Sequence, residues 1–151
     1  MENTVQDVIE KEVIINGSKE RVFQAISDPA QITSWFPEGI EGSLAVGEKP
    51  VFDFGKHGKV QVVIIASEPS DYFAYRWIPG SNVHSEEEIS ETLDHPNTLV
   101  EFRLEDIEGK TKVTVKETGF ASLPSETYEK ILGENTKGWE FMLGRLEKFI
   151  N

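Results

Sequence analysis

The sequence predicts an α+β fold in which an antiparallel sheet is covered on one face by a single long C-terminal helix. Three observations favour this class. The chain contains 13 Val and 13 Ile against 8 Leu, a bias that is typical of strands. Strand-like alternation fills the middle of the chain, and an apolar stripe at helical spacing occupies its end. Strands followed by a terminal helix indicate an α+β arrangement.

The N-terminal part predicts a strand followed by a short helix. Residues 8–15 alternate imperfectly between apolar and charged side chains and end at Asn16-Gly17, which is a turn signal. Ser18 has the residue type and position of a helix N-cap. Apolar residues follow at helical spacing between positions 22 and 26, so we expect the first helix there.

A second short helix is predicted to begin at Asp28-Pro29. Asp is a favourable N-cap, and proline is well tolerated at the first helical position. This helix is expected to carry Trp35 and Phe36 and to end before Pro37, because a proline disfavours helical backbone in the residue before it.

The middle of the chain predicts several strands. Residues 51–54 and 60–66 flank a plausible hairpin connection at residues 55–58. Residues 60–66 are apolar on both faces, which indicates a central strand rather than an edge strand. Residues 72–78 form a further predicted strand, one face of which carries the rings of Phe73, Tyr75 and Trp77.

The pattern is weakest over residues 80–97. This stretch is acidic and fits an edge strand, a short helix or a long loop, of which we favour an edge strand or a loop. Clean alternation returns at residues 100–105, with the side chains of Val100, Phe102 and Leu104 on one face. A hairpin turn at residues 108–110 leads into a last strand, so about six antiparallel strands are expected after the two helices.

The end of the chain predicts an amphipathic helix that begins near residues 124–126. Gly133 and Gly138 weaken it by about 1 kcal/mol each relative to alanine. Apolar residues nevertheless recur at intervals of three or four, which predicts a wide apolar stripe facing the sheet. The stripe consists of Trp139, Met142, Leu143, Leu146 and Ile150.

The composition predicts one acidic domain over residues 1–151. With 15 basic and 27 acidic side chains the net charge is −12, and phosphate backbones and anionic lipid surfaces repel such a protein. We therefore expect neither nucleic acid nor a membrane as a partner. The chain has no cysteine, and its N-terminus does not resemble a secretory signal. Both features favour a cytoplasmic protein without disulfides.

The predicted inward faces are strongly aromatic. Large rings that meet one helix can leave an apolar pocket with a few polar groups, although a filled core is their commonest use. Glu117 lies two residues after Val115 and so continues the alternation that places Val113 and Val115 on the inward face. The simpler expectation is that the strand has ended by then and that this carboxylate lies in water. The candidate cavity-lining residues are Trp35, Phe36, Phe52, Phe54, Tyr75, Trp77, Phe102, Glu117, Trp139 and Leu143.

No catalytic or metal-binding motif stands out. His57, His84 and His95 fall in turns or in the acidic stretch and lack the spacing of metal ligands, so neither a metal nor a cofactor is predicted. The motifs GxSxG and GxxxxGK, which mark acyl transfer and phosphate binding, are missing. An acid–base pair in the cavity would need Glu117 together with Tyr75 or His57.

Three segments resemble one protein family. Residues 22–36, VFQAISDPAQITSWF, resemble the opening VW-x-A-[IL]-T-D-P-x-x-[IL]-x-x-W-[FW] of the activators of the 90-kDa heat-shock-protein ATPase and their homologues. Residues 116–120 resemble the family's T-x-x-G-F, and Gly138-Trp139 with Leu143 and Leu146 resembles its G-W-x-x-x-L-x-x-L. This family belongs to the START/polyketide-cyclase (SRPBCC) superfamily.

The resemblance implies a helix-grip fold, in which a curved antiparallel sheet wraps around the C-terminal helix and encloses a hydrophobic cavity. It departs from the family at residues 81–97, which are longer and more acidic than the usual connection. The lining that it implies consists of Trp35, Phe36, Tyr75, Trp77, Phe120 and Trp139.

Three functions remain open, since a fold does not fix an activity. The leading hypothesis is non-enzymatic binding of a small hydrophobic molecule in the cavity. The second, which the family suggests, is a co-chaperone that binds a heat-shock protein and activates its ATPase. The third is a cyclase or dehydratase type of enzyme that acts in the cavity.

Overall fold

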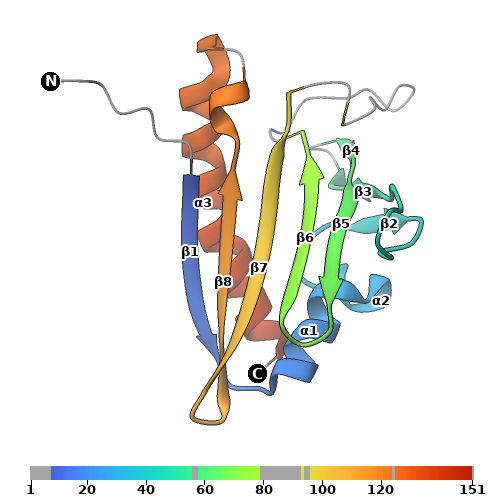
Figure 1. Ribbon diagram of the computed structural model, residues 1–151, viewed down its shortest axis with the longest axis vertical. Helices are drawn as coiled ribbons and strands as arrows, with labels where there is room; N and C mark the ends of the chain where they lie inside the picture. Colours follow the sequence, from blue (N-terminus) through green and yellow to red (C-terminus); the bar gives the residue numbers. More distant parts are fainter. Residues whose placement is uncertain (1–7, 56–57, 79–92, 94–95, 124, 151) are drawn as a thin grey trace, which may run out of the picture.

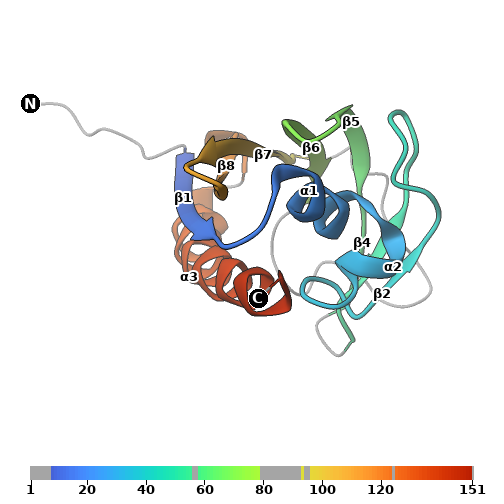
Figure 2. The ribbon, with the colours of Figure 1, turned by 90° about the horizontal axis from the view of Figure 1, so that it is seen from below.

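The computed structural model describes the chain except for residues 1–7, 56–57, 79–92, 94–95, 124 and 151. The described residues form a five-stranded antiparallel sheet in the order β1-β8-β7-β6-β5. Figures 1 and 2 show this sheet curving around the long helix α3, which lies along its inner side next to β1 and β8. The elements are β1 (Val8–Ile15), β5 (Val63–Glu68), β6 (Tyr72–Trp77), β7 (Thr98–Ile107), β8 (Lys110–Thr118) and α3 (Ser125–Ile150).

The two short helices begin where the sequence predicts them. Ser18 caps α1 (Lys19–Ser27) by accepting a hydrogen bond from the backbone N–H of Arg21 at 3.1 Å. Asp28 caps α2 (Pro29–Ile32) in the same way through the N–H of Ala30 at 3.0 Å. The capping residues Ser18 and Asp28 were therefore sufficient to predict where these two helices begin.

The predicted extension of α2 through Phe36 is wrong, because this helix ends at Ile32. The chain then turns, and the N–H of Phe36 donates to the carbonyl of Ile32 at 2.9 Å. Trp35 is fully buried, and its indole N–H donates to the carbonyl of Ala25 at 2.8 Å. The chain therefore leaves the helix after Ile32, and the rings of Trp35 and Phe36 are buried in the core.

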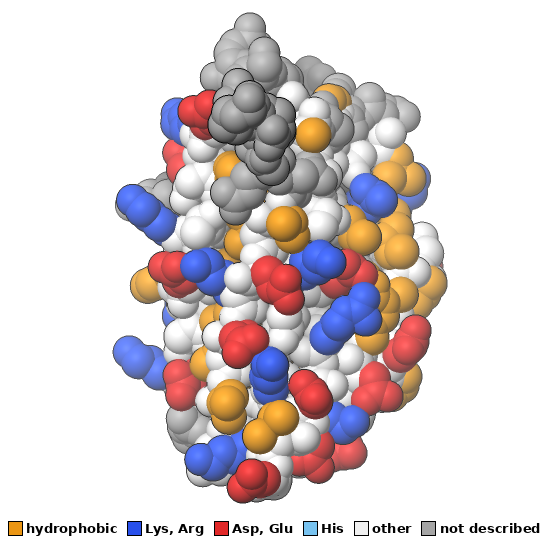
Figure 3. All heavy atoms as spheres, turned by 60° about the vertical axis from the view of Figure 1, so that its left-hand side comes forward, with side chains coloured by type: hydrophobic (Ala, Val, Ile, Leu, Met, Phe, Trp, Pro, Cys, Tyr) orange, Lys and Arg blue, Asp and Glu red, His pale blue; other side chains and the backbone are white. Residues whose placement is uncertain are grey.

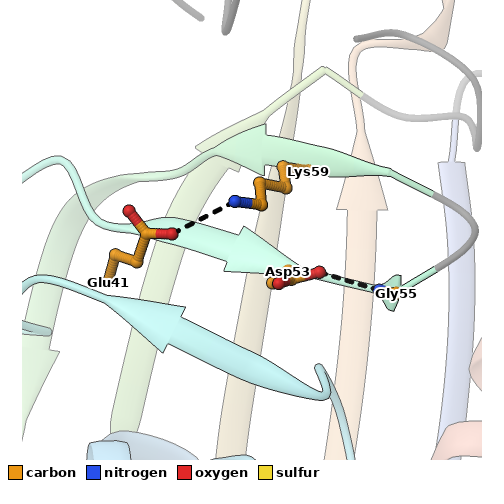
Figure 4. A network of polar contacts seen from close by, with 4 residues as sticks. All are labelled: Glu41, Asp53, Gly55 and Lys59. Atoms are coloured by element: carbon orange, nitrogen blue, oxygen red, sulfur yellow. Dashed lines mark hydrogen bonds and ion pairs between the residues drawn. The ribbon is translucent and has the colours of Figure 1, made fainter. Parts of the chain in front are cut away.

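A small second sheet lies beside the large one. Its described strands run in the order β2-β3-β4, with β2 at Gly39–Glu41, β3 at Val51–Asp53 and β4 at Lys59–Gln61. Figure 4 shows the polar contacts that support it: Lys59 pairs with Glu41 at 3.3 Å, and Asp53 accepts from the N–H of Gly55 at 2.8 Å. The sequence analysis did not predict β2, which is only three residues long.

The prediction of one central strand over residues 60–66 is wrong. The segment divides at Val62 into β4 and β5, and β5 lies at an edge of the large sheet. Val63 and Ile64 are nevertheless buried. The backbone of residues 47–50 follows this edge: the N–H of Gly47 donates to the carbonyl of Ile64 at 2.9 Å. The backbone of residues 47–50 is therefore hydrogen-bonded to the outer edge of β5, although β5 is the last strand of the large sheet.

The β7–β8 hairpin and α3 confirm the predictions for the second half of the chain. Glu108 and Gly109 connect the strands with positive φ angles of 51° and 86°, as a tight hairpin turn requires. Trp139, Leu143 and Leu146 of α3 are buried. Most of residues 80–97 lies outside the described part of the chain, so that prediction stays untested.

The surface over β1 and α3 carries mixed charge. In Figure 3 acidic and basic side chains are interspersed over this side of the molecule. An ion pair between Lys11 of β1 and Glu140 of α3, 2.6 Å long, joins the sheet edge to the helix. Among the described helices, none is long and apolar enough to cross a bilayer.

Candidate functional site

Glu117 lies in the interior, so the expected exposed position is wrong. Its relative exposure is 0%. The strand does not end before it: β8 continues to Thr118, and Glu117 is paired with Ile9 of β1 on one side and with Val100 of β7 on the other. Because residues that are paired across an antiparallel sheet share a face, this carboxylate faces inward with Val100.

The carboxylate of Glu117 accepts hydrogen bonds from four side chains. The indole N–H groups of Trp77 and Trp139 donate to Oε2 and Oε1, at 2.9 and 2.8 Å. The hydroxyl of Thr98 donates to Oε2 at 2.6 Å. The amide of Asn135 lies 3.0 Å from Oε1 and 3.3 Å from Oε2. These contacts supply the hydrogen bonds that a buried carboxylate needs.

These partners come from three elements of the fold, β6, β7 and α3. Trp77 and Thr98 are directly paired at the ends of β6 and β7. Asn135 and Trp139 lie four residues apart on α3, a spacing that places them on one face of a helix. The hydrogen bonds of Glu117 therefore join three strands to the helix that covers them.

Gly119 lets the chain leave β8 immediately after the buried carboxylate. Its φ angle is +104°, and a Cβ at this position would lie 3.3 Å from the carbonyl oxygen of Asn97. Only glycine adopts such a backbone without strain. The reversal places Phe120, which is fully buried, at the start of a short 3₁₀ helix before α3.

Tyr75 presents a buried hydroxyl near this carboxylate. Tyr75, Val100 and Glu117 lie side by side on β6, β7 and β8, so all three face the interior. The hydroxyl is buried and has no hydrogen-bond partner among the described residues. Burial, and secondarily the negative charge of Glu117, raise the pKa of Tyr75 well above its usual value. The phenol therefore stays protonated and able to donate.

An aromatic cluster surrounds the two polar groups. Phe36 lies at its centre, with its ring centroid 5.4 Å from that of Trp139 and 5.8 Å from that of Trp77. Tyr75 lies 5.3 Å from Trp77. These are normal separations for interacting rings. The rings connected in this way are those of Trp35, Phe36, Phe52, Phe54, Phe73, Tyr75, Trp77, Phe102 and Trp139.

The structure brings most of the predicted lining residues together. Eight of these rings were candidates from the sequence, and Glu117 is hydrogen-bonded to two of them. Phe120 and Leu143 belong to the same hydrophobic core. Phe54 is only partly buried, so the cluster reaches the surface there. His57, His84 and His95 lie outside the described residues.

The sequence analysis missed Thr98 and Asn135. Thr98 lies between the weak stretch at residues 80–97 and the clean alternation that begins at residue 100, and only the strand register places it opposite Trp77. Asn135 had a detectable signal, because it lies one helical turn before Trp139 on the predicted helix. A polar residue on the face of the apolar stripe indicates a buried partner.

The geometry of Glu117 is that of a satisfied acceptor. Each of its oxygens accepts at least two hydrogen bonds, which occupies the lone pairs that a general base needs. Tyr75 is not hydrogen-bonded to it. Within the described residues, no group of three or more His, Asp or Glu is placed to hold a metal ion. In the described part of the chain, the arrangement therefore consists of a satisfied carboxylate and one buried hydroxyl without a partner inside an aromatic cluster.

Comparison with known proteins identifies relatives of the whole chain. The family model of the Activator of Hsp90 ATPase homolog 1-like proteins matches residues 16–151, which is most of the sequence. No curated protein matches the chain.

Solved structures share the fold at low sequence identity. MLL2253 from Mesorhizobium loti is 20% identical with a TM-score of 0.75, over 95% of this chain and 96% of its own. The Aha1 dimer from Colwellia psychrerythraea is 18% identical with a TM-score of 0.71, over 96% of both chains. DynU16, a putative protein in the dynemicin biosynthetic locus, has a TM-score of 0.75 and 20% identity over 97% of this chain, which spans only 48% of DynU16. These likenesses confirm the helix-grip fold of the START type.

Proposed function

The chain belongs to the Activator of Hsp90 ATPase homolog 1-like family, and we propose that it binds a small, largely hydrophobic molecule between the sheet and α3 without converting it. The fold family typically binds hydrophobic ligands. The observation that carries the proposal is the hydroxyl of Tyr75, which is buried among aromatic rings and has no partner among the described residues.

A buried hydroxyl without a hydrogen-bond partner lowers the stability of the folded protein. A residue that only fills the core would not carry such a group. Such a group destabilises the folded state by about 1–3 kcal/mol, and phenylalanine would fill the same space without that cost. A ligand that accepts a hydrogen bond from Tyr75 explains why tyrosine stands there. Phe36, Trp77 and Trp139 supply apolar walls of the kind that ligand sites have, and the partly exposed Phe54 marks the side of entry.

Binding of neutral, environment-sensitive dyes tests this proposal. Prodan and Nile red each carry a carbonyl group that Tyr75 can contact. We expect both dyes to gain blue-shifted emission with the wild-type protein, and Tyr75→Phe to weaken binding about fivefold, the equivalent of one ordinary hydrogen bond. The matched control is Tyr72→Phe on the same strand, whose hydroxyl instead donates to Glu101.

The outcomes separate the parts of this proposal. Absence of binding by both dyes, together with native mass spectra that show no molecule bound to the purified protein, would contradict ligand binding. Equal binding to wild type and Tyr75→Phe would contradict the role of Tyr75 alone. Weaker binding to Tyr72→Phe than to Tyr75→Phe would place the ligand elsewhere.

A second candidate function is activation of a heat-shock-protein ATPase. The observation in its favour is the family match, whose description names activators of Hsp90 ATPase. An ATPase assay with the Hsp90 of the same organism distinguishes the two functions. A stimulation that persists in Tyr75→Phe would favour the co-chaperone role, whereas ligand binding predicts no stimulation.

The cyclase or dehydratase alternative lacks a supporting observation. It needed Glu117 to exchange a proton with Tyr75 or His57. Both oxygens of Glu117 already accept hydrogen bonds from other groups, and His57 lies outside the described residues. We therefore do not propose catalysis.

A further inference from the structure

We propose that the outward face of α3 is a docking surface for an acidic helix of another protein. The proposal does not depend on the ligand proposed above, because this face lies on the opposite side of α3 from the interior site. It follows from a row of basic side chains without ion-pair partners among the described residues, an exposed phenylalanine within the row, and two glycines beside it.

Exposed basic residues follow the outward face of α3. Lys137 precedes the buried Trp139 by two residues, which is a rotation of about 200° around a helix, so it points away from the core. Three further basic residues lie seven, eight and eleven positions from Lys137, and these steps return to the same side of a helix within about 80°. This basic row consists of Lys130, Lys137, Arg145 and Lys148.

The basic row has no ion-pair partner in the part of the chain that the structure describes. Basic side chains on the strands behave differently: Lys11 pairs with Glu140, and Lys59 pairs with Glu41. The chain has 27 acidic against 15 basic side chains, so unpaired cations in a row are unexpected on this molecule. The row leaves positive charge available on an acidic protein, and it attracts a partner of opposite charge.

Phe141 gives the basic row an apolar centre. It is 65% exposed, more than any other large hydrophobic side chain among the described residues. Lys137 and Arg145 lie four residues before and after it, so the ring lies between two cations on the helix surface. Aromatic and arginine side chains contribute most strongly to protein interfaces once a partner covers them. This combination fits a partner that carries an apolar side chain among carboxylates.

Gly133 and Gly144 leave open space beside the basic row. A Cβ at either position would meet nothing within 4 Å, and each glycine destabilises the helix by about 1 kcal/mol relative to alanine. Eleven residues separate them, which is about three turns, so both lie on the same side as Lys137. Packing among the described residues requires neither glycine. A partner helix explains both, since glycine permits close approach of another backbone.

The basic row fits a short helix better than a broad anionic surface. It runs from Lys130 to Lys148, which is about 27 Å of helix. A separate acidic row lies along α3 on the side of β1, where Glu140 pairs with Lys11. A nucleic-acid duplex or an anionic bilayer would extend over this acidic row and be repelled. The acidic row consists of Glu129, Glu140 and Glu147.

Titration of the ¹⁵N-labelled protein with a designed peptide tests the proposal by NMR. The probe is an alanine-based helix of about 20 residues with glutamate at every third or fourth position and one central leucine. Its matched control has glutamine in place of glutamate. We expect amide shifts around Lys137, Phe141 and Arg145 with the glutamate peptide only. Salt at about 0.5 M should abolish these shifts.

Variants at exposed positions assign the binding to this face. Lys137→Glu should weaken binding about fivefold or more. Lys110→Glu makes the same change in net charge at an exposed position of β8 and should leave binding unchanged. Gly144→Gln should weaken binding while it raises the Tm, because it fills the open space and favours the helix. Unchanged indole N–H signals of the tryptophans show that each variant is folded.

The outcomes separate an acidic helix from other partners. Absent shifts, or shifts that are as large around Lys110 as around Phe141, would overturn the proposal. Equal shifts on adding duplex DNA or phosphatidylserine vesicles would also overturn it, in favour of phosphate recognition. A dimer in analytical ultracentrifugation that Phe141→Ser abolishes would show that a second copy covers the face instead. The dye experiments test the interior site separately.

Discussion

Glu117 is the residue on which the polar contacts of the interior converge. Its donors come from β6, β7 and α3, so its removal should affect several elements together. Hydrogen bonds to a charged acceptor are stronger than neutral ones. We therefore expect Glu117→Gln to lower the free energy of unfolding by about 2 kcal/mol, as measured by urea denaturation.

The indole N–H signals of the three tryptophans give an internal control for this prediction. In ¹H–¹⁵N spectra, Glu117→Gln should shift the signals of Trp77 and Trp139 strongly. The signal of Trp35 should not move, because its indole N–H donates to the carbonyl of Ala25. Unchanged signals for Trp77 and Trp139 would show that they do not donate to Glu117.

Tyr75 should affect stability and binding in opposite directions. Tyr75→Phe removes a buried hydroxyl without a described partner, so we expect it to raise the free energy of unfolding by about 1 kcal/mol while it weakens ligand binding. Tyr72→Phe should lower the free energy of unfolding by up to about 1 kcal/mol, since its hydroxyl donates to Glu101. A loss of stability in Tyr75→Phe, measured in urea, would contradict an unsatisfied hydroxyl.

Alkaline pH should destabilise the protein through the same two tyrosines. Burial and then the hydrogen bond to Glu101 raise the pKa of Tyr72 from 10.0 to about 12, and the pKa of Tyr75 is also raised. Above pH 10 the unfolded chain loses phenolic protons that the folded chain retains. The stabilisation is therefore complete below pH 10 and is lost as the pH rises toward 12 and beyond.

Urea denaturation at about pH 9 and about pH 11.5 measures this loss. Lysines also titrate in this range, so the informative quantity is the difference between variants. Tyr72→Phe should show a smaller loss of stability than the wild type. Equal losses in the two proteins would contradict the raised pKa of Tyr72.

The position of an individual site residue could be predicted only where a local sequence pattern determines which way its side chain points. The strand alternation placed Tyr75 and Trp77 inward, and the structure agrees. The burial of Glu117 was missed because it depends on whether β8 extends beyond Val115, and strand ends are poorly defined by sequence. Thr98 could not be assigned, because its role depends on the register of β7 against β6.

At the level of secondary structure, we expect alanine substitutions to have opposite effects on stability at the glycines of α3 and at Gly119. A Cβ added at Gly133 or Gly138 of α3 would meet nothing within 4 Å. Alanine at either position should raise the free energy of unfolding by about 1 kcal/mol through its higher helix propensity. Gly119→Ala should lower it by more than about 1 kcal/mol, since the φ angle of +104° is strained for alanine.

Thermal denaturation of the three glycine variants checks this contrast. A rise in Tm for the α3 variants with a fall for Gly119→Ala is expected. Destabilisation by Gly133→Ala or Gly138→Ala would show that the helix surface at that position is covered by another part of the molecule. An unchanged Tm for Gly119→Ala would contradict the positive φ angle.

Elements with strong local signals were predicted well, and those defined by contacts were not. Ser18 and Asp28 fixed the starts of α1 and α2 through side-chain caps. The end of α2 and the division of residues 60–66 depend on tertiary structure. The second of these reflects a chain that passes from the small sheet to the large one at Val62, which the apolar pattern does not show.

At the scale of the whole molecule, α3 is held to the sheet by both polar and apolar contacts. The ion pair of Lys11 with Glu140 lies at the surface, and Trp139 and Asn135 reach the buried Glu117. Leu143 and Leu146 fill the core beside them. The order of elements predicted a terminal amphipathic helix packed across one face of the sheet, and the family resemblance specified the helix-grip arrangement.

The central claim is that a ligand occupies the interior between the sheet and α3. Intermolecular nuclear Overhauser effects between 2-acetylnaphthalene and the protein test it most directly. We predict contacts from the naphthalene protons to the side chains of Tyr75, Trp77 and Trp139. Contacts confined to exposed apolar side chains such as Phe141, which is 65% exposed, would contradict the claim.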